Sequence, residues 1–93
     1  MRKFIVERNI PGAGNLTPAD LSEIAKKSQA AINDLGKPYH WVQTYVVKDK
    51  LFCVHVAPDE ETVRKHSALG CFPVDQVYEV VDIFDASKVN SIS

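Results

Sequence analysis

The sequence predicts a single α+β domain, and three observations support that prediction. A chain of 93 residues with 45% hydrophobic and 25% charged content fits one compact core. Short runs rich in β-branched and aromatic residues lie between turn signals, which is typical of strands. Two other segments carry helix start and stop signals around apolar residues spaced three and four apart. The predicted order is strand, helix, strand, strand, helix, strand.

The first strand is predicted over residues 3–9, where KFIVERN ends at the turn-forming IPGAGN. The first helix follows at LTPADL. Thr17 suits the N-cap, Pro18 suits the first helical position, and Asp20 places an acid where the helix dipole favours it. Gly36, with a proline two residues later, ends the helix.

Residues 41–56 (WVQTYVVKDKLFCVHV) predict two strands around a charged turn. A second, shorter helix begins after Asp59 as N-cap and ends at Gly70. The run DQVYEVVDIFD then predicts a fourth strand over residues 75–85. We therefore expect one domain over residues 1–86 and a polar tail over residues 87–93.

This order is the split βαβ pattern of ferredoxin-like folds, a four-stranded antiparallel sheet with both helices on one face. The other face would expose apolar side chains to water. The usual remedy is to pack two sheets face to face across a two-fold axis, so we expect a homodimer built as an α+β barrel. A chain this short also buries only about 60–65% of its unfolded surface, which favours a partner subunit.

The charge pattern and apolar runs exclude several classes of partner. Eleven basic and twelve acidic residues give a formal charge of −1, so the sequence predicts no nucleic-acid partner and no anionic membrane surface. We find no apolar run long enough for a secretory signal or a membrane span, and we expect a cytoplasmic protein. In that compartment Cys53 and Cys71 are expected to be free thiols.

Strand alternation sorts the hairpin side chains between the two sheet faces. We assign the purely apolar set, which is Phe52 with the valines at positions 54 and 56, to the sheet face that packs against the helices. Cys53 and His55 then fall on the second face. This assignment requires an odd-residue turn over residues 48–50, whereas a two-residue turn would place Cys53 on the same face as Thr44.

With that register, several polar side chains would line one cavity in the barrel interior: Glu7, Gln43, Tyr45, Cys53 and His55. A carboxylate on a central strand needs a partner unless Glu7 sits at a frayed end. Cys53 could instead be a small buried hydrophobe, and Tyr45 could simply pack its ring. His66 falls on the inward stripe of the second helix, either as a structural histidine or as a ligand.

Three stretches carry a resemblance to a known family: VERNIPGAGNLTPADL, WVQTYVVKDKLFCVHVAPDEETVRKH and GCFPVDQVYEV. They resemble a family of small bacterial domains of uncharacterised function that includes an actinobacterial nickel-binding protein. The resemblance implies a homodimer with polar side chains inside its barrel and a possible site for nickel or another divalent transition metal. From the residue types and their predicted positions, the candidate ligands in this chain are some of Glu7, Tyr45, Cys53, His55 and His66. Gln43 stands where the family pattern often has a histidine.

Three functions remain open on the sequence. The first is a homodimer that binds a divalent metal or a small ligand in its interior. The second is a cofactor-independent enzyme of the oxygenase or isomerase type. The third is a non-catalytic dimerisation module. Metal retention would favour the first, an empty apolar cavity the second, and a fully packed interface the third.

Overall fold

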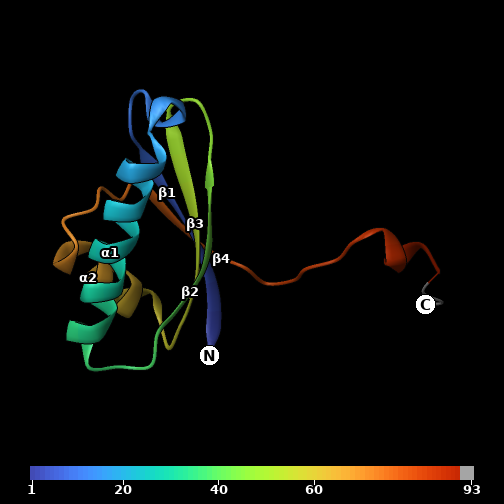
Figure 1. The fold of residues 1–93 in the computed structure, drawn as a ribbon. Helices are drawn as coiled ribbons and strands as arrows, with labels where there is room; N and C mark the ends of the chain where they lie inside the picture. The colour runs from blue at the N-terminus through green and yellow to red at the C-terminus, as the bar shows by residue number, and fades with distance from the viewer. Residues whose placement is uncertain (91–93) are drawn as a thin grey trace.

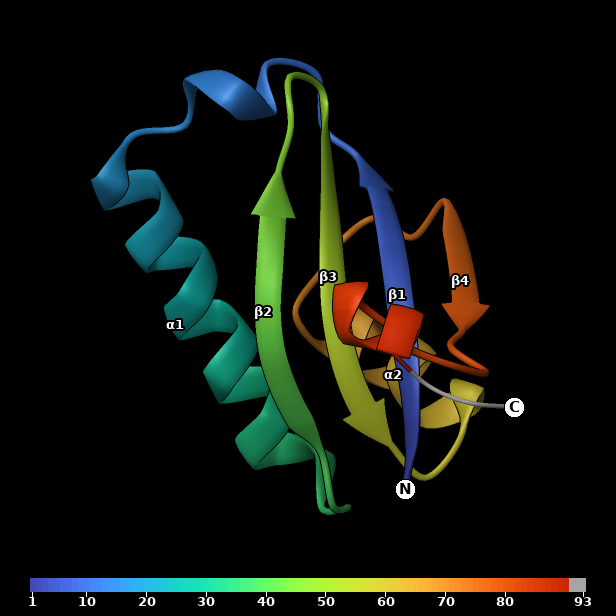
Figure 2. The same cartoon turned by 90° about the vertical axis from the view of Figure 1, so that its right-hand side faces the viewer.

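The computed structural model describes residues 1–90, and these form a four-stranded antiparallel sheet with two helices on one face (Figure 1). The strands and helices are β1 (Arg2–Asn9), α1 (Pro18–Leu35), β2 (His40–Val46), β3 (Lys50–Ala57), α2 (Glu60–Leu69) and β4 (Gln76–Glu79). The sheet order is β2-β3-β1-β4 (Figure 2). The predicted ferredoxin-like α+β fold is therefore confirmed. Residues 91–93 of the predicted tail lie outside the described residues.

Both helices begin at the caps that the sequence predicts. Thr17 Oγ1 accepts a hydrogen bond from the Asp20 N–H (3.1 Å), and the Asp20 carboxylate accepts one from the Thr17 N–H (2.9 Å). The two contacts form a capping box. Asp59 caps α2 by accepting from the Thr62 N–H at 2.8 Å. Within residues 1–90 neither helix is long and apolar enough to cross a lipid bilayer.

The loop between β1 and α1 holds the turn between β2 and β3. The backbone N–H of Gly14 donates to the carbonyl of Lys48, and that of Ile10 donates to the carbonyl of Asp49, both at 2.9 Å. The Asp49 carboxylate accepts from the Gly12 N–H. Gly14 allows this close approach, because a Cβ there would lie 3.3 Å from the Lys48 Cα and would push the turn away by a few tenths of an ångström. The turn is thus fixed by contacts outside the hairpin.

The hairpin turn contains two residues, not the three that we predicted. The Val47 N–H donates to the Lys50 carbonyl at 3.0 Å, so only Lys48 and Asp49 lie inside the turn. In the resulting register Cys53 pairs with Thr44. This is the alternative that the sequence left open.

The side chains of β3 consequently face the opposite way from our assignment. Cys53 and His55 point toward the helices, whereas Phe52 and Val54 lie on the sheet face opposite the helices, which we call the open face. A one-residue change in register exchanges the two faces of a strand, so the prediction for the whole strand was wrong. On β1, Phe4 lies in the core and Glu7 lies on the open face.

The strand β2 contains a β-bulge between Trp41 and Gln43. Trp41 pairs with His55, and Gln43 pairs with Val54, so Val42 is an extra residue in the ladder. Trp41 therefore faces the helices while Gln43 faces the other way.

The fourth strand is shorter than residues 75–85. Glu79 is its last residue, and one further backbone hydrogen bond joins the Val80 N–H to the Lys3 carbonyl (2.8 Å). Its neighbour β1 begins at Arg2, so residues beyond 80 have almost no β1 residues left to pair with. Residues 81–90, which we call the C-terminal arm, extend away from the sheet on its open side (Figure 1).

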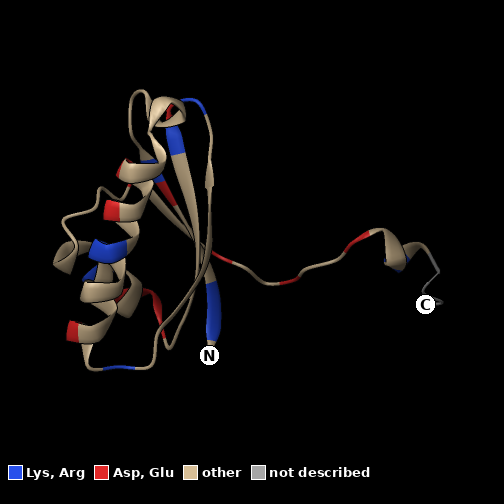
Figure 3. Ribbon diagram, in the orientation of Figure 1, with Lys and Arg blue, Asp and Glu red and all other residues tan. Residues whose placement is uncertain are grey.

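Acidic and basic positions are interspersed over the described residues. Along α1 they follow one another, and the C-terminal arm carries Asp82 and Asp85 (Figure 3). This mixture agrees with the formal charge of −1.

Candidate ligand pocket

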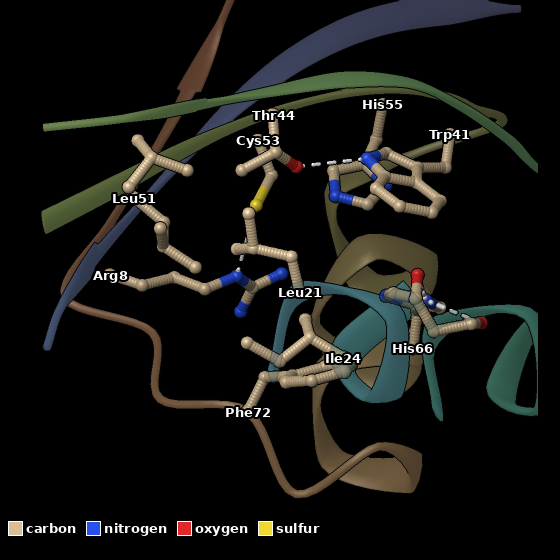
Figure 4. Close-up of a pocket in the computed structure, with 12 residues that line it drawn as sticks. Arg8, Leu21, Ile24, Trp41, Thr44, Leu51, Cys53, His55, His66 and Phe72 are labelled. Carbon is tan, nitrogen blue, oxygen red and sulfur yellow. Dashed lines mark hydrogen bonds between the residues drawn. The ribbon is translucent and has the colours of Figure 1, made fainter. Parts of the chain in front are cut away.

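A cavity of about 200 Å³ lies between the β2–β3 side of the sheet and the two helices (Figure 4). Its walls are mostly apolar, with a few polar groups brought in by strands and helices. The lining residues are Arg8, Leu21, Ile24, Ser28, Trp41, Thr44, Val46, Leu51, Cys53, His55, His66 and Phe72. A concave apolar cavity with a few convergent polar groups is the usual form of a small-molecule site.

His55 is the least satisfied polar side chain of this pocket. It is 1% exposed, and neither of its ring nitrogens has a hydrogen-bond partner among the described residues. A neutral imidazole carries one donor and one acceptor, and each costs free energy when it is buried without a partner. His55 therefore offers two unused hydrogen-bonding positions beside the cavity.

His66 reaches the same region from α2. Its Nε2 lies 3.3 Å from the Ser28 carbonyl oxygen and 3.2 Å from Ser28 Oγ. A carbonyl oxygen can only accept, so Nε2 carries the proton in the neutral ring and Nδ1 is an acceptor. Nδ1 is buried and has no partner among the described residues.

The ring of Tyr39 packs against both histidine rings. Its ring stacks on His66 with centroids 4.7 Å apart and lies tilted against His55 at 5.2 Å. The two imidazoles are 5.1 Å apart. This packing of rings fixes their orientation without using the ring nitrogens.

Burial keeps both histidines neutral. Loss of solvent, together with smaller effects of the neighbouring His66 and Arg8, lowers the pKa of His55 to about 3. Burial also lowers the pKa of His66, against the opposing effect of its hydrogen bond to Ser28. Near neutral pH the pocket therefore holds two uncharged imidazoles.

Arg8 supplies the positive charge of the pocket. Its Nε donates to Cys53 Sγ (3.4 Å), and its Nη1 donates to Ser67 Oγ (3.0 Å) and to the Pro73 carbonyl (2.8 Å). The guanidinium carbon lies 5.2 Å from the centre of the Phe72 ring. Figure 4 shows the guanidinium group between Cys53 and Phe72.

Glu7 has the partner that the sequence predicts, on the other side of the sheet. Its carboxylate accepts hydrogen bonds from Lys50 Nζ (2.9 Å) and from the Tyr78 hydroxyl (3.1 Å). The hydrogen bond from Lys50 is the main cause that lowers the pKa of Glu7. Nearby on this face, the amide of Gln43 donates to the Tyr45 hydroxyl.

The five candidate metal ligands are thus divided between the two sides of the sheet. Cys53, His55 and His66 line the pocket, while Glu7 and Tyr45 lie on the open face. Our expectation that Glu7, Tyr45, Cys53 and His55 line one cavity was wrong, because it depended on the three-residue turn. Among residues 1–90 no group of three or more His, Cys, Asp or Glu side chains is placed to hold a metal ion.

Arg8 and Trp41 line the pocket but were not among the predicted site residues. A signal for Arg8 was available, because it shares the alternation of Phe4 and Val6 on β1 and so had to point toward the helices. The orientation of Trp41 toward the helices depends on the β-bulge, which has no local sequence signature.

Fold and pocket together define a small ferredoxin-like domain with a mostly apolar cavity between its sheet and its helices. Residues 4–80 match the model of a family described as nickel responsive protein SCO4226-like, and the chain belongs to this family. Among solved structures, the crystal structure of SCO4226 from Streptomyces coelicolor A3(2) is similar, with a TM-score of 0.75 at 18% identity. The match covers 88% of this chain and 99% of that one. No curated protein matched the chain.

The pocket is a poor fit to nickel within one chain. The donors Cys53, His55 and His66 are of suitable types, since imidazole and thiolate bind divalent transition metals. However, the guanidinium of Arg8 contacts Cys53 Sγ directly, and a fixed positive charge at that distance opposes a second cation. A nickel site here would need a rearranged pocket or further ligands.

We expect stability to fall as the pH is lowered from 6.5 toward 4.5. An unfolded histidine takes up a proton in this range, whereas His55 stays neutral down to about pH 3 and the pKa of His66 is also lowered. The unfolded state then binds more protons, so the free energy of unfolding decreases by up to about 1.4 kcal/mol per pH unit for each histidine. Urea unfolding at several pH values measures this slope.

The matched variants are His55→Phe, which should flatten the slope, and the exposed His40→Gln, which should leave it unchanged. The pKa of Glu7 is lowered in the folded protein, so protonation of such carboxylates reduces the free energy of unfolding only as the pH falls further. An identical slope in His55→Phe would show that His55 is not held neutral by burial.

Proposed function

We propose that the protein binds a small organic molecule in the pocket between the sheet and the helices. The observation that carries this proposal is His55, a buried imidazole with two unpartnered nitrogens in the wall of an apolar cavity. Buried polar groups in folded proteins are nearly always paired, by protein or by ordered water. A ligand with an apolar body and one hydrogen-bonding group would satisfy His55 and fill the space.

The size of the cavity limits the ligand to a single ring or a short chain. An engineered apolar cavity of about 150 Å³ in another protein binds benzene, and this pocket measures about 200 Å³. Leu21 and Val46 line the cavity and are both partly exposed, which gives a route of entry at the gap between α1 and β2.

Cyclohexanecarboxamide is a suitable neutral test ligand, because it has one saturated ring and one amide. Trp41 is the single tryptophan of the chain and lines the pocket, so its fluorescence reports occupancy. We expect a saturable change in fluorescence. His55→Phe should weaken binding by about fivefold, because one hydrogen bond contributes about 1 kcal/mol.

Tyr45→Phe is the matched control, since Tyr45 lies on the open face and should not affect the affinity. A linear response without saturation, or equal weakening by both variants, would contradict binding in this pocket.

Nickel binding is the second candidate function, and the description of the family supports it. It would use Cys53, His55 and His66, the three predicted ligands that share the pocket. The contact between Arg8 and Cys53 weighs against it, which is why we rank it second.

After dialysis against nickel and removal of free metal, we expect well under one nickel per subunit, because Arg8 opposes a cation beside Cys53. Elemental analysis measures the ratio. One nickel per subunit that is lost in Cys53→Ala but kept in Cys71→Ala, which removes the exposed cysteine, would make nickel binding the function.

We also propose that the protein is a homodimer that pairs through the open face. This face carries exposed apolar side chains, including Tyr45 (56% exposed), and the groove across it is lined by Ile5, Val54 and Phe84. The C-terminal arm adds Val81 (94% exposed) and Phe84 (78% exposed). Apolar groups gathered on one side in this way are typical of an interface, and a second copy of the chain would cover both.

Sedimentation or light scattering should therefore give about twice the 10.4 kDa mass of the chain. Tyr45→Lys should shift the protein to the monomer mass, because it places a charge in the paired face. Ala30→Lys, on the exposed side of α1, should leave the mass unchanged. A monomer at all concentrations in the unmodified protein would contradict this assembly.

A further inference from the structure

Arg8 is a buried cation that has no acidic partner among residues 1–90. Its side chain is 1% exposed, and its hydrogen bonds go to a thiol, a hydroxyl and a carbonyl, all of them neutral groups. The four ion pairs within the described residues use Arg2, Lys26, Lys50 and Arg64 instead. An arginine remains protonated in proteins, and burying its charge is costly unless an anion compensates it.

The position of Arg8 makes the pocket the place where such an anion would bind. The guanidinium lines the cavity, and its Nη2 has no hydrogen-bond partner among the described residues. His55 lines the same cavity and can offer an N–H from its unpartnered ring. Most of the other walls are apolar side chains such as Leu21 and Ile24. Other polar groups of the lining are Ser28, Thr44 and His66. The pocket thus combines the positive charge of Arg8, an unused neutral donor on His55 and a mostly apolar lining.

We propose that the natural ligand of this pocket is a small carboxylic acid with an apolar body, whose carboxylate binds Arg8 and His55. This inference rests on the proposed function and names the chemical class of its ligand. Two donors match the two oxygens of a carboxylate, and arginine pairs with planar carboxylates especially well. A phosphate group would bring more charge and more oxygen atoms than these donors can satisfy in an apolar cavity.

The neutral state of the histidines agrees with this arrangement. Because burial holds the pKa of His55 near 3, the imidazole acts as an uncharged donor, and Arg8 alone balances the ligand charge. A single negative charge is therefore the matching complement.

The test compares cyclohexanecarboxylate with cyclohexanecarboxamide, which share the same ring, by Trp41 fluorescence near neutral pH. Charge-assisted hydrogen bonds are roughly twice as strong as neutral ones, so we expect the acid to bind at least about tenfold more tightly. Arg8→Met should reduce this ratio to about one while the amide still binds. Lys3→Met, which removes a cation from the open face of the same strand, should leave the ratio unchanged.

Equal affinity for acid and amide in the unmodified protein would overturn the carboxylate assignment and leave the proposed function standing. Binding of neither compound would overturn both. A preference for the acid that survives in Arg8→Met would place recognition elsewhere and overturn the role of Arg8. If Arg8→Met does not fold, Arg8→Lys tests the same point, since it keeps the charge but loses the planar fork and should lower the ratio.

Discussion

The two-residue turn at Lys48 and Asp49 is the constraint on which the pocket depends. Strand alternation means that this turn decides which side chains of β3 face the helices. The loop after β1 fixes the turn from outside through backbone hydrogen bonds, one of them from Gly14. Cys53 and His55 reach the pocket only because of this register, and without them the cavity would be lined by Phe and Val side chains.

Most of the fold could be predicted because its signals are local. The caps at Thr17 and Asp59 mark the helix starts in the sequence, and the partner of Glu7 follows from the cost of burying a carboxylate. The hairpin register could not be predicted in the same way. Both alternations along β3 contain apolar residues, so the apolar pattern does not choose between them, and the β-bulge that turns Trp41 inward has no local signature. The end of β4 depends on where its partner strand β1 begins, and this pairing between distant segments is not visible in the local sequence.

The electrostatics of the pocket bear on the choice between an organic ligand and a metal ion as its proposed occupant. His55 and His66 are donor types that metals use, and their presence made the metal hypothesis reasonable from sequence. Arg8 changes that balance, because it brings a permanent positive charge next to Cys53. The chain belongs to a family described as nickel responsive, so nickel binding has to be tested by experiment. A metal ion and an organic ligand would both be sought in this pocket.

Glu7 and Arg8 are neighbours in sequence but lie on opposite sides of the sheet, because alternate residues of β1 point to opposite faces. Since β1 is an inner strand, bonded to both β3 and β4, any displacement of it moves the two side chains together. Thermodynamic linkage then requires reciprocity: if occupancy of the pocket strengthens subunit pairing through this strand, pairing must strengthen occupancy by the same factor. The one strand therefore carries a side chain of the cavity and a side chain of the open face at adjacent positions.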